Sequence, residues 1–235
     1  MKIKLAQINP TVGDIDGNAK KIISIIKKAN ADIVVFPELS VTGYSPQDLL
    51  LKKNFIGQNM AALKRIADNT KNKSAILGFA EKEDRFIYNS AAFIKNRQVI
   101  AVHRKICLPN YSIFDEKRWF TEGKKATIFD FLGKKIGLSI CEDIWHPDTL
   151  KKQKEKGADL IINISASPYS KGKIEKMEGI LTQRWEENHL PIIYVNQAGA
   201  QDGIVYYGHS LYFKDGKVIG KCMDFAEDIL TVKIF

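Results

Sequence analysis

The sequence predicts an α/β fold in which two sheets pack face to face and helices cover both outer faces, a four-layer αββα sandwich. Strand-like apolar runs alternate with helical segments, and this alternation occurs in two similar halves. Helices outside and sheets inside bury the apolar face of every element. A single doubly wound sheet is the alternative that the same pattern allows. No linker, low-complexity tract or break in composition appears, so we expect one domain spanning residues 1–235.

The first half of the chain begins with a strand and a helix, and the pair then recurs. Four isoleucines lie between positions 22 and 26 of a largely polar segment, which is typical of an amphipathic helix. The apolar run 33–36 is broken by Pro37, which ends a strand. We expect strands at 3–8, 32–36 and 75–81, helices at 18–30 and 55–69, and a hairpin over 86–105 that turns at 95–98.

The second half repeats the order of strand, helix and strand. Its first strand is a β-branched apolar run that follows the Leu132-Gly133 turn. The last hairpin turns at Asp215-Gly216, a dipeptide that suits a tight turn. We expect strands at 136–140, 159–165 and 191–196, helices at 148–156 and 174–188, and a closing hairpin of 211–214 with 217–221.

The composition is that of a soluble globular protein, with 45% hydrophobic and 27% charged residues. Its three cysteines, Cys107, Cys141 and Cys222, are odd in number and far apart, which indicates neither a disulfide framework nor a metal site. The charged start of the chain is too short for a signal peptide, and no apolar stretch is long enough to span a membrane. We therefore expect a cytoplasmic protein without a metal, a cofactor or a membrane partner.

The formal net charge of +9 raises the question of a nucleic-acid partner. The lysines occur singly or in pairs on the polar faces of the expected helices, and no dense basic stripe is interleaved with aromatic residues. Strand binding or base readout needs clustered cations with stacking platforms. We therefore expect solvated helix faces and no nucleic-acid site.

Cys141 directly follows the buried run 136–140 and directly precedes the acidic residues Glu142 and Asp143. This placement predicts a strand-to-helix elbow at the carboxyl edge of a sheet, where open α/β folds bind their ligands. Backbone N–H groups at such an elbow point at the sulfur and favour the thiolate. The placement therefore makes Cys141 a candidate nucleophile.

Two further reactive residues also follow expected strands. Glu38 comes after the run 33–37, and Lys105 comes after the run 99–104. If the three strands are neighbours that run in the same direction, Glu38, Lys105 and Cys141 meet at one rim. A carboxylate could then take the thiol proton, the thiolate could attack an amide carbonyl, and the ammonium could stabilise the oxyanion.

Each of these residues also has an ordinary structural interpretation. Cys141 could be a buried structural cysteine, Glu38 a solvated loop carboxylate and Lys105 a surface lysine. His103 or His209 could instead pair with the cysteine, although both lie in strand-like sequence. The residues alone leave these alternatives open.

Three segments that contain these residues resemble the nitrilase, or carbon–nitrogen hydrolase, superfamily. They are Phe36-Pro37-Glu38-Leu39, the run from Arg104 to Tyr111, and Cys141-Glu142-Asp143-Ile144-Trp145. The resemblance extends over nearly the whole chain and implies the αββα sandwich of that superfamily. It also implies an amidohydrolase in which Glu38 is the general base, Lys105 the oxyanion partner and Cys141 the nucleophile.

Longer strings are similar to the glutaminase domain of glutamine-dependent NAD synthetases: AQINPTVGD at 6–14, TGYSPQDLL at 42–50 and LPNYSIFDEKR at 108–118. This likeness implies that the substrate is glutamine and that a cysteinyl thioester forms as ammonia is released. It further implies supporting roles for Glu116 and Glu142. The expected substrate-binding residues are Tyr44, Tyr111, Ser167 and Lys173.

The sequence departs from the synthetase pattern in two places. No glycine- and serine-rich pyrophosphate loop of an ATP-binding domain is present before Phe235, so we expect any ammonia to pass to a separate NAD synthetase subunit. Tyr207 and His209 stand where the resemblance leads us to expect an acidic and a smaller residue.

Three hypotheses about function follow. The first is a glutaminase, the second a stand-alone ω-amidase or other small-carboxamide hydrolase, and the third a non-catalytic regulatory module that keeps the fold. The resemblance also implies association through helices beside the site, so we expect a homodimer or a higher oligomer.

Overall fold

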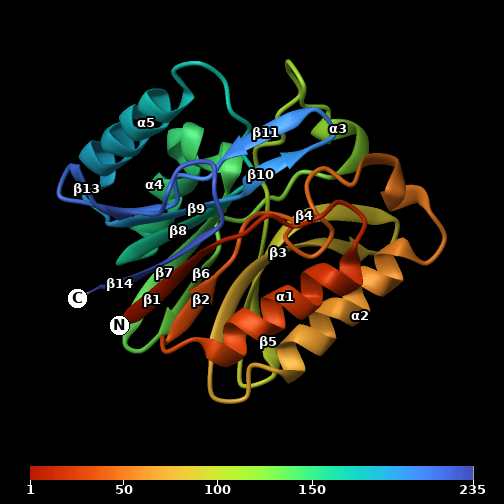
Figure 1. Ribbon diagram of the computed structural model, residues 1–235. Coiled ribbons are helices and arrows are strands. Elements are labelled where there is room, and N and C mark those ends of the chain that lie inside the picture. Colours follow the sequence, from red (N-terminus) through yellow and green to blue (C-terminus); the bar gives the residue numbers. More distant parts are fainter. Residues whose placement is uncertain (235) are drawn as a thin grey trace.

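Two six-stranded sheets pack face to face in the computed structural model, which describes residues 1–234. Helices α1 and α2 cover the outer face of one sheet, and α4 and α5 cover the outer face of the other (Figure 1). The predicted αββα sandwich is confirmed, and the alternative of a single doubly wound sheet is wrong.

The first sheet has the strand order β14-β1-β2-β3-β4-β5. Strands β1, β2 and β3 are parallel, β4 and β5 follow as antiparallel neighbours, and β14 pairs antiparallel with β1. The strands are β1 (Lys2–Gln7), β2 (Ile33–Val35), β3 (Ser74–Glu83), β4 (Phe86–Lys95), β5 (Gln98–Arg104) and β14 (Asp228–Lys233).

The second sheet has the order β13-β12-β9-β8-β7-β6, with β7, β8 and β9 parallel. A separate two-stranded sheet is formed by β10 and β11. The strands are β6 (Ile128–Phe131), β7 (Lys134–Ile140), β8 (Leu160–Ser165), β9 (Ile192–Asn196), β10 (Ala198–Gln201), β11 (Ile204–Tyr207), β12 (Leu211–Lys214) and β13 (Lys217–Lys221).

The four longer helices agree with the sequence expectations except at their ends, whereas the short α3 was not expected. Helix α1 begins at Ile15, three residues before the predicted start, because the Asp14 side chain accepts a hydrogen bond from Gly17 N at 2.9 Å and caps the helix. The helical elements are α1 (Ile15–Lys28), α2 (Phe55–Asp68), α3 (Glu116–Trp119), α4 (Pro147–Glu155) and α5 (Lys173–Asn188), with 3₁₀ turns η1 (Gln47–Leu51) and η2 (Cys141–Trp145).

The core lies in three layers, which explains why the parallel strands read as continuous apolar runs. Ile33 and Val35 of β2 face the second sheet, whereas Val34 faces α1 and α2. Likewise, Ile162 of β8 faces the first sheet and Ile161 faces α4 and α5. A strand with both faces buried has no polar alternation. Burial of each such side chain contributes about 1.5–3 kcal/mol.

Both predicted hairpin turns are confirmed. Lys95 pairs with Gln98, and the two residues between them, Asn96 and Arg97, have positive φ angles of 49° and 68°. The Asp215-Gly216 turn has φ angles of 52° and 73°. Two successive residues with positive φ form the turn whose twist suits a hairpin.

The sequence analysis missed four strands, β6, β10, β11 and β14. Strand β14 completes the first sheet by pairing Lys2 with Lys233, and the predicted hairpin of β12 and β13 forms the edge of the second sheet. This pairing brings the N-terminal and C-terminal parts of the chain side by side (Figure 1). No helix within residues 1–234 is long and apolar enough to cross a membrane.

Candidate active site

The three candidate residues follow strands that are not all neighbours. Glu38 follows β2 and Lys105 follows β5, but β3 and β4 lie between those two strands, and Cys141 follows β7 of the other sheet. Strands β2 and β5 do run in the same direction. Glu38 and Lys105 therefore come together from the first sheet, 2.7 Å apart, and Cys141 comes from the second sheet, near enough for both charges to act on its pKa.

Glu38 is fully buried and each of its oxygens accepts hydrogen bonds. Oε1 accepts from Lys105 Nζ at 2.7 Å and from Asn89 Nδ2 at 2.7 Å. Oε2 accepts from the backbone N–H of Ala166 at 2.9 Å. Asn89 lies on β4 and Ala166 follows β8, so residues of both sheets hold the carboxylate in place.

Lys105 is a buried cation shared by two carboxylates. Its Nζ donates to Glu38 Oε1 and to Glu116 Oε1, both at 2.7 Å. Burial lowers the pKa of this ammonium, but the charges of Glu116 and Glu38 raise it more, so the pKa stands well above its ordinary value. Lys105 is therefore charged at neutral pH.

Glu116 lies at the start of α3 and is the second carboxylate of this network. Its Oε1 also accepts from the hydroxyl of Tyr44 at 2.7 Å, whereas its buried Oε2 has no hydrogen-bond partner among the described residues. Burial, together with the nearby charge of Glu38, raises the pKa of Glu116 to about 7, against the opposing effect of Lys105. Glu116 can therefore gain or lose a proton near neutrality.

Cys141 occupies the predicted elbow, at the junction of β7 and η2. Its φ is 43°, a left-handed conformation that costs a residue with a side chain on the order of 1–3 kcal/mol. Burial first, and then the charge of Glu38, raise the pKa of the Cys141 thiol well above its ordinary value, although Lys105 lowers it. The expectation of a resting thiolate is therefore wrong, because loss of solvent outweighs the favourable charge.

Two glycines allow the strand ends to lie where they do. A Cβ added at Gly78 of β3 would lie 2.1 Å from Leu39 N, so the segment that carries Glu38 can cross β3 only over a glycine. A Cβ at Gly123 would lie 2.1 Å from Arg104 O, and Gly123 N donates to Lys105 O at 2.7 Å. The close approach of backbone at both places requires glycine.

The expected substrate-binding residues differ in how they are placed. The Tyr44 hydroxyl is engaged with Glu116, and Tyr111 is exposed and donates to Glu142 Oε2 at 2.9 Å. Glu142 thus contacts the Tyr111 loop and not the Lys105 ion pairs. Lys173 Nζ lies 4.2 Å from the ring centre of Trp145, and burial lowers the pKa of Lys173.

Ser167 and the two unexpected residues lie in the interior. Ser167 is buried, and its backbone N–H donates to Asn196 Oδ1 at 2.8 Å. The Tyr207 hydroxyl lies 2.9 Å from the hydroxyl of Tyr194. His209 lies between two carboxylates, and His103 contacts Asp143. Neither histidine is hydrogen-bonded to Cys141, so the alternative of a Cys–His pair has no support.

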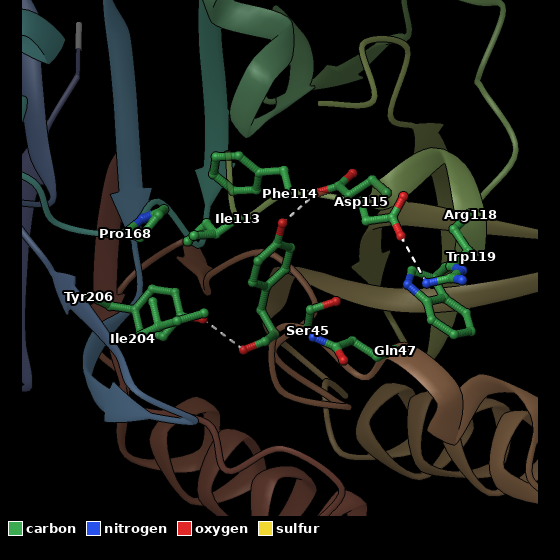
Figure 2. Close-up of a pocket in the computed structure, with 12 residues that line it drawn as sticks. Ser45, Gln47, Ile113, Phe114, Asp115, Arg118, Trp119, Pro168, Ile204 and Tyr206 are labelled. Carbon is green, nitrogen blue, oxygen red and sulfur yellow. Dashed lines mark hydrogen bonds and ion pairs between the residues drawn. The ribbon is translucent and has the colours of Figure 1, made fainter. Parts of the chain in front are cut away.

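A cavity of about 210 Å³ reaches this network from outside. Figure 2 shows its lining, in which Phe114 and Trp119 come from the segment around α3, and Ile204 and Tyr206 come from β11. Tyr44 and Glu116 also line it, and the Tyr206 hydroxyl donates to Tyr44 O at 3.0 Å. A small polar molecule could therefore approach Glu116 through this opening.

Sequence reasoning missed several residues that hold the site together: Asn89, the N–H of Ala166, Asp143 and Tyr206. Asn89 is a polar residue with a buried side chain in a largely apolar strand, but Ser90 beside it is polar too, so the sequence does not single it out. No group of three or more His, Cys, Asp or Glu side chains among residues 1–234 could hold a metal ion.

A family model described as carbon-nitrogen hydrolase matches residues 2–235. The chain is 40% identical over 239 residues to a glutamine-dependent NAD(+) synthetase of Aquifex aeolicus and 38% identical over 242 residues to one of Thermotoga maritima. Each match covers 100% of this chain but 42% of the relative. The chain thus spans less than half the length of these relatives.

Solved structures agree with this match. The glutamine-dependent NAD+ synthetase of Acinetobacter baumannii, in complex with ADP, superposes with a TM-score of 0.94 at 38% identity, over 98% of this chain and 44% of that one. An amidase from Nesterenkonia sp. superposes with a TM-score of 0.91 at 22% identity, over 100% of this chain and 90% of that one. The amidase likeness supports the fold.

Proposed function

Because the chain belongs to the carbon–nitrogen hydrolase family, we propose that it hydrolyses the side-chain amide of glutamine by way of a thioester on Cys141. The observation that carries this proposal is the buried network in which Glu38 and Glu116 share the Lys105 ammonium within electrostatic reach of the Cys141 thiol. The choice of glutamine is supported by the names of the relatives at 38–40% identity.

In the proposed acylation step, Glu38 takes the thiol proton as the sulfur attacks the amide carbonyl. The high pKa of the resting thiol means that this proton moves with the attack and not before it. The Lys105 ammonium and the backbone N–H that follows Cys141 stabilise the oxyanion. Glu38 then returns the proton to the leaving nitrogen, the C–N bond breaks and ammonia departs.

In the proposed deacylation step, Glu38 takes a proton from water, and the resulting hydroxide attacks the thioester. The C–S bond breaks, the sulfur recovers a proton and glutamate leaves. Three hydrogen bonds hold the Glu38 carboxylate, which keeps its oxygens fixed through both steps. Such preorganisation avoids reorganisation during the reaction.

We assign supporting roles to two carboxylates. Glu116 holds Lys105, and its unpartnered Oε2 can accept a hydrogen bond from a substrate amine or amide. Glu142 restrains the loop that carries Tyr111. Tyr44 orients Glu116, so its contribution to substrate binding is through that carboxylate.

For the substrate's α-carboxylate we propose Lys173 as the partner. This cation is partly buried over Trp145, and the charges of Cys141 and Glu142 act on its pKa, which indicates that it lies near both. Ser167 and Tyr111 complete the proposed set of substrate contacts. Lys173→Met should therefore raise KM for glutamine more than it lowers kcat.

We further propose that the ammonia is used by an NAD synthetase, in a separate subunit, and that the chain forms at least a homodimer. The names of the relatives support the first part. Adding a synthetase-type protein should make NAD formation depend on glutamine in a coupled assay. A monomer in light scattering at micromolar concentration would refute the proposed homodimer.

Glutamate release by the wild type and by Cys141→Ala tests the proposed chemistry. We expect release by the wild type and none by the variant. Cys222→Ala is the matched control, because Cys222 is also a buried free cysteine but lies beyond β13. Equal rates for wild type and Cys141→Ala would refute the mechanism.

Two further measurements distinguish the alternative functions. A preference for α-ketoglutaramate over glutamine would favour the ω-amidase. Failure of a glutamine-analogue electrophile to label Cys141 would favour a non-catalytic module.

A further inference from the structure

Asp143 is a fully buried carboxylate on which four donors converge. Its Oδ1 accepts from the backbone N–H of Ile106 at 2.9 Å and of Cys107 at 2.8 Å. Its Oδ2 accepts from the backbone N–H of Ile140 at 2.9 Å and lies 2.9 Å from His103 Nε2. Each oxygen therefore has two partners.

These contacts define the ionisation of the group. Three of the partners are backbone donors, which favours the carboxylate, and toward a carboxylate oxygen His103 Nε2 is the donor. Burial raises the pKa of Asp143, but the contacts with His103 and the backbone outweigh it, and the pKa is lowered. His103 Nδ1 has no partner among the described residues, which favours the tautomer with hydrogen on Nε2.

The donors come from both segments that carry the proposed reacting groups. His103, Ile106 and Cys107 flank Lys105, whereas Ile140 and Asp143 flank Cys141. These segments follow β5 and β7, which belong to different sheets and share no backbone ladder. The carboxylate of Asp143 is thus a direct link between them.

We propose that Asp143 is a positioning residue that fixes the Lys105 ammonium relative to the Cys141 thiol, and that His103 is its side-chain partner. The inference rests on the proposed function for its kinetic meaning, but the linkage itself is geometric. We assign Asp143 no proton transfer, because each of its oxygens already has two partners and none of them is a side chain of the proposed reacting groups. It acts through the placement of the cation that stabilises the oxyanion.

The kinetic consequence is a loss in kcat without a matching rise in KM. Lys105 interacts most strongly with the charge that develops in the transition state, so its displacement affects the transition state more than the bound substrate. A misplacement of about 1 Å at a reacting group can cost about a hundredfold in rate. We expect a loss of about this size when the link is broken.

The test compares three variants. Asp143→Asn keeps the shape of the side chain but replaces one acceptor oxygen with an NH₂ donor. That donor then faces a backbone N–H or His103, which are donors themselves. His103→Leu removes one donor, whereas His103→Gln retains a donor near Nε2. We expect kcat to fall about a hundredfold in Asp143→Asn and about tenfold in His103→Leu, to recover in His103→Gln, and KM to stay within about threefold throughout.

Gln153→Ala is the matched control for a general loss of stability. Gln153 is buried on α4, and its Nε2 donates to Leu138 O of β7, the same strand that leads to Cys141. Its hydrogen bonds go to Thr127 O and Leu138 O and not to the segment around Lys105, so this variant should lower Tm and retain kcat. Parallel losses of Tm and kcat in all the variants, Gln153→Ala included, would overturn the proposal.

A second measurement does not depend on glutamine hydrolysis. The rate at which iodoacetamide alkylates Cys141, mapped by peptide mass, should rise with pH at a midpoint that Lys105 lowers. We expect this midpoint to move to higher pH in Asp143→Asn and His103→Leu, but not in Gln153→Ala. An unchanged midpoint in folded Asp143→Asn refutes the positioning role. A shifted midpoint in a protein that does not hydrolyse glutamine refutes only the proposed function.

Discussion

Lys105 and Glu38 form an ion pair with no exposure to solvent: Nζ lies 2.7 Å from Oε1, and both side chains are 0% exposed. Glu116 pairs with the same ammonium at 2.7 Å. Two buried carboxylates therefore share one buried cation. Burial first, and then the charge of Glu38, raise the pKa of Glu116 to about 7, although Lys105 lowers it.

Removal of the cation should destabilise the protein strongly. Lys105→Met leaves two carboxylates buried without a cation, and breaking a buried pair in this way costs about 3–5 kcal/mol. We expect the free energy of unfolding, measured in urea at pH 8, to fall by this amount. The loss should shrink toward pH 5 as Glu116 takes up a proton.

Lys64→Met provides the control for loss of a lysine. Lys64 pairs with Asp68 on the surface, where both side chains are more than half exposed. Its removal should leave the free energy of unfolding unchanged within error. An equal, small effect of Lys105→Met would show that the buried ion pairs do not hold the site.

The pH dependence of stability should reveal Glu116. Its folded-state pKa of about 7 is higher than the ordinary 4.5, so the folded state binds this proton more tightly than the unfolded state. The stabilising contribution is full below pH 4.5 and is lost as pH rises through about 7. In Glu116→Gln the free energy of unfolding should therefore decline less between these limits than in the wild type. Identical declines in the two proteins would contradict the assignment.

Tyr44→Phe should shift the pH range over which Glu116 loses its proton to higher pH. The Tyr44 hydroxyl donates to Glu116 Oε1 and lowers its pKa, so loss of that bond should raise the pKa of Glu116. The control is Tyr206→Phe, which removes a hydroxyl bonded to the Tyr44 backbone and leaves the phenol of Tyr44 intact. The pH series in urea should show the shift in the first variant and not in the second.

Gly78→Ala should impair the site through the backbone. The added Cβ would lie 2.1 Å from Leu39 N, so the segment that carries Glu38 must shift, and we expect glutamine hydrolysis to fall about a hundredfold. Gly179 of α5 has nothing within 4 Å of its added Cβ. Gly179→Ala should therefore keep its activity and gain about 0.5–1 kcal/mol in stability. Full activity of Gly78→Ala would show that Glu38 need not be held so tightly.

The sequence predicted the buried elements of the fold well, because a strand covered on both faces leaves a continuous apolar run. It failed for β6, β10, β11 and β14, which alternate polar and apolar residues or are short. Strand β14 pairs with β1 at the other end of the chain. The two strands come together only when the whole chain has folded, so no pattern in the sequence near β14 indicates this pairing.

The candidate site, too, could be predicted from the sequence only in part. Glu38, Lys105 and Cys141 could be selected because each follows a strand. Gly78, Asn89 and Asp143 contact these segments from distant parts of the fold, and no local pattern indicates those contacts. Desolvation also reversed the expected ionisation of Cys141, and burial cannot be judged from neighbours in the sequence. The extent of the domain, the roles of the site residues and the oligomeric state stay predictions.

The most direct test of the central claim is the intact mass of the enzyme quenched in acid during turnover of glutamine. The account predicts an adduct with the mass of one γ-glutamyl group, located on the peptide that contains Cys141. The adduct should accumulate in Glu38→Gln if any acylation occurs there, because deacylation needs the same base, and it should be absent from Cys141→Ala. Glutamate release by the wild type with no adduct at any quench time, and with release retained in Cys141→Ala, would contradict the account.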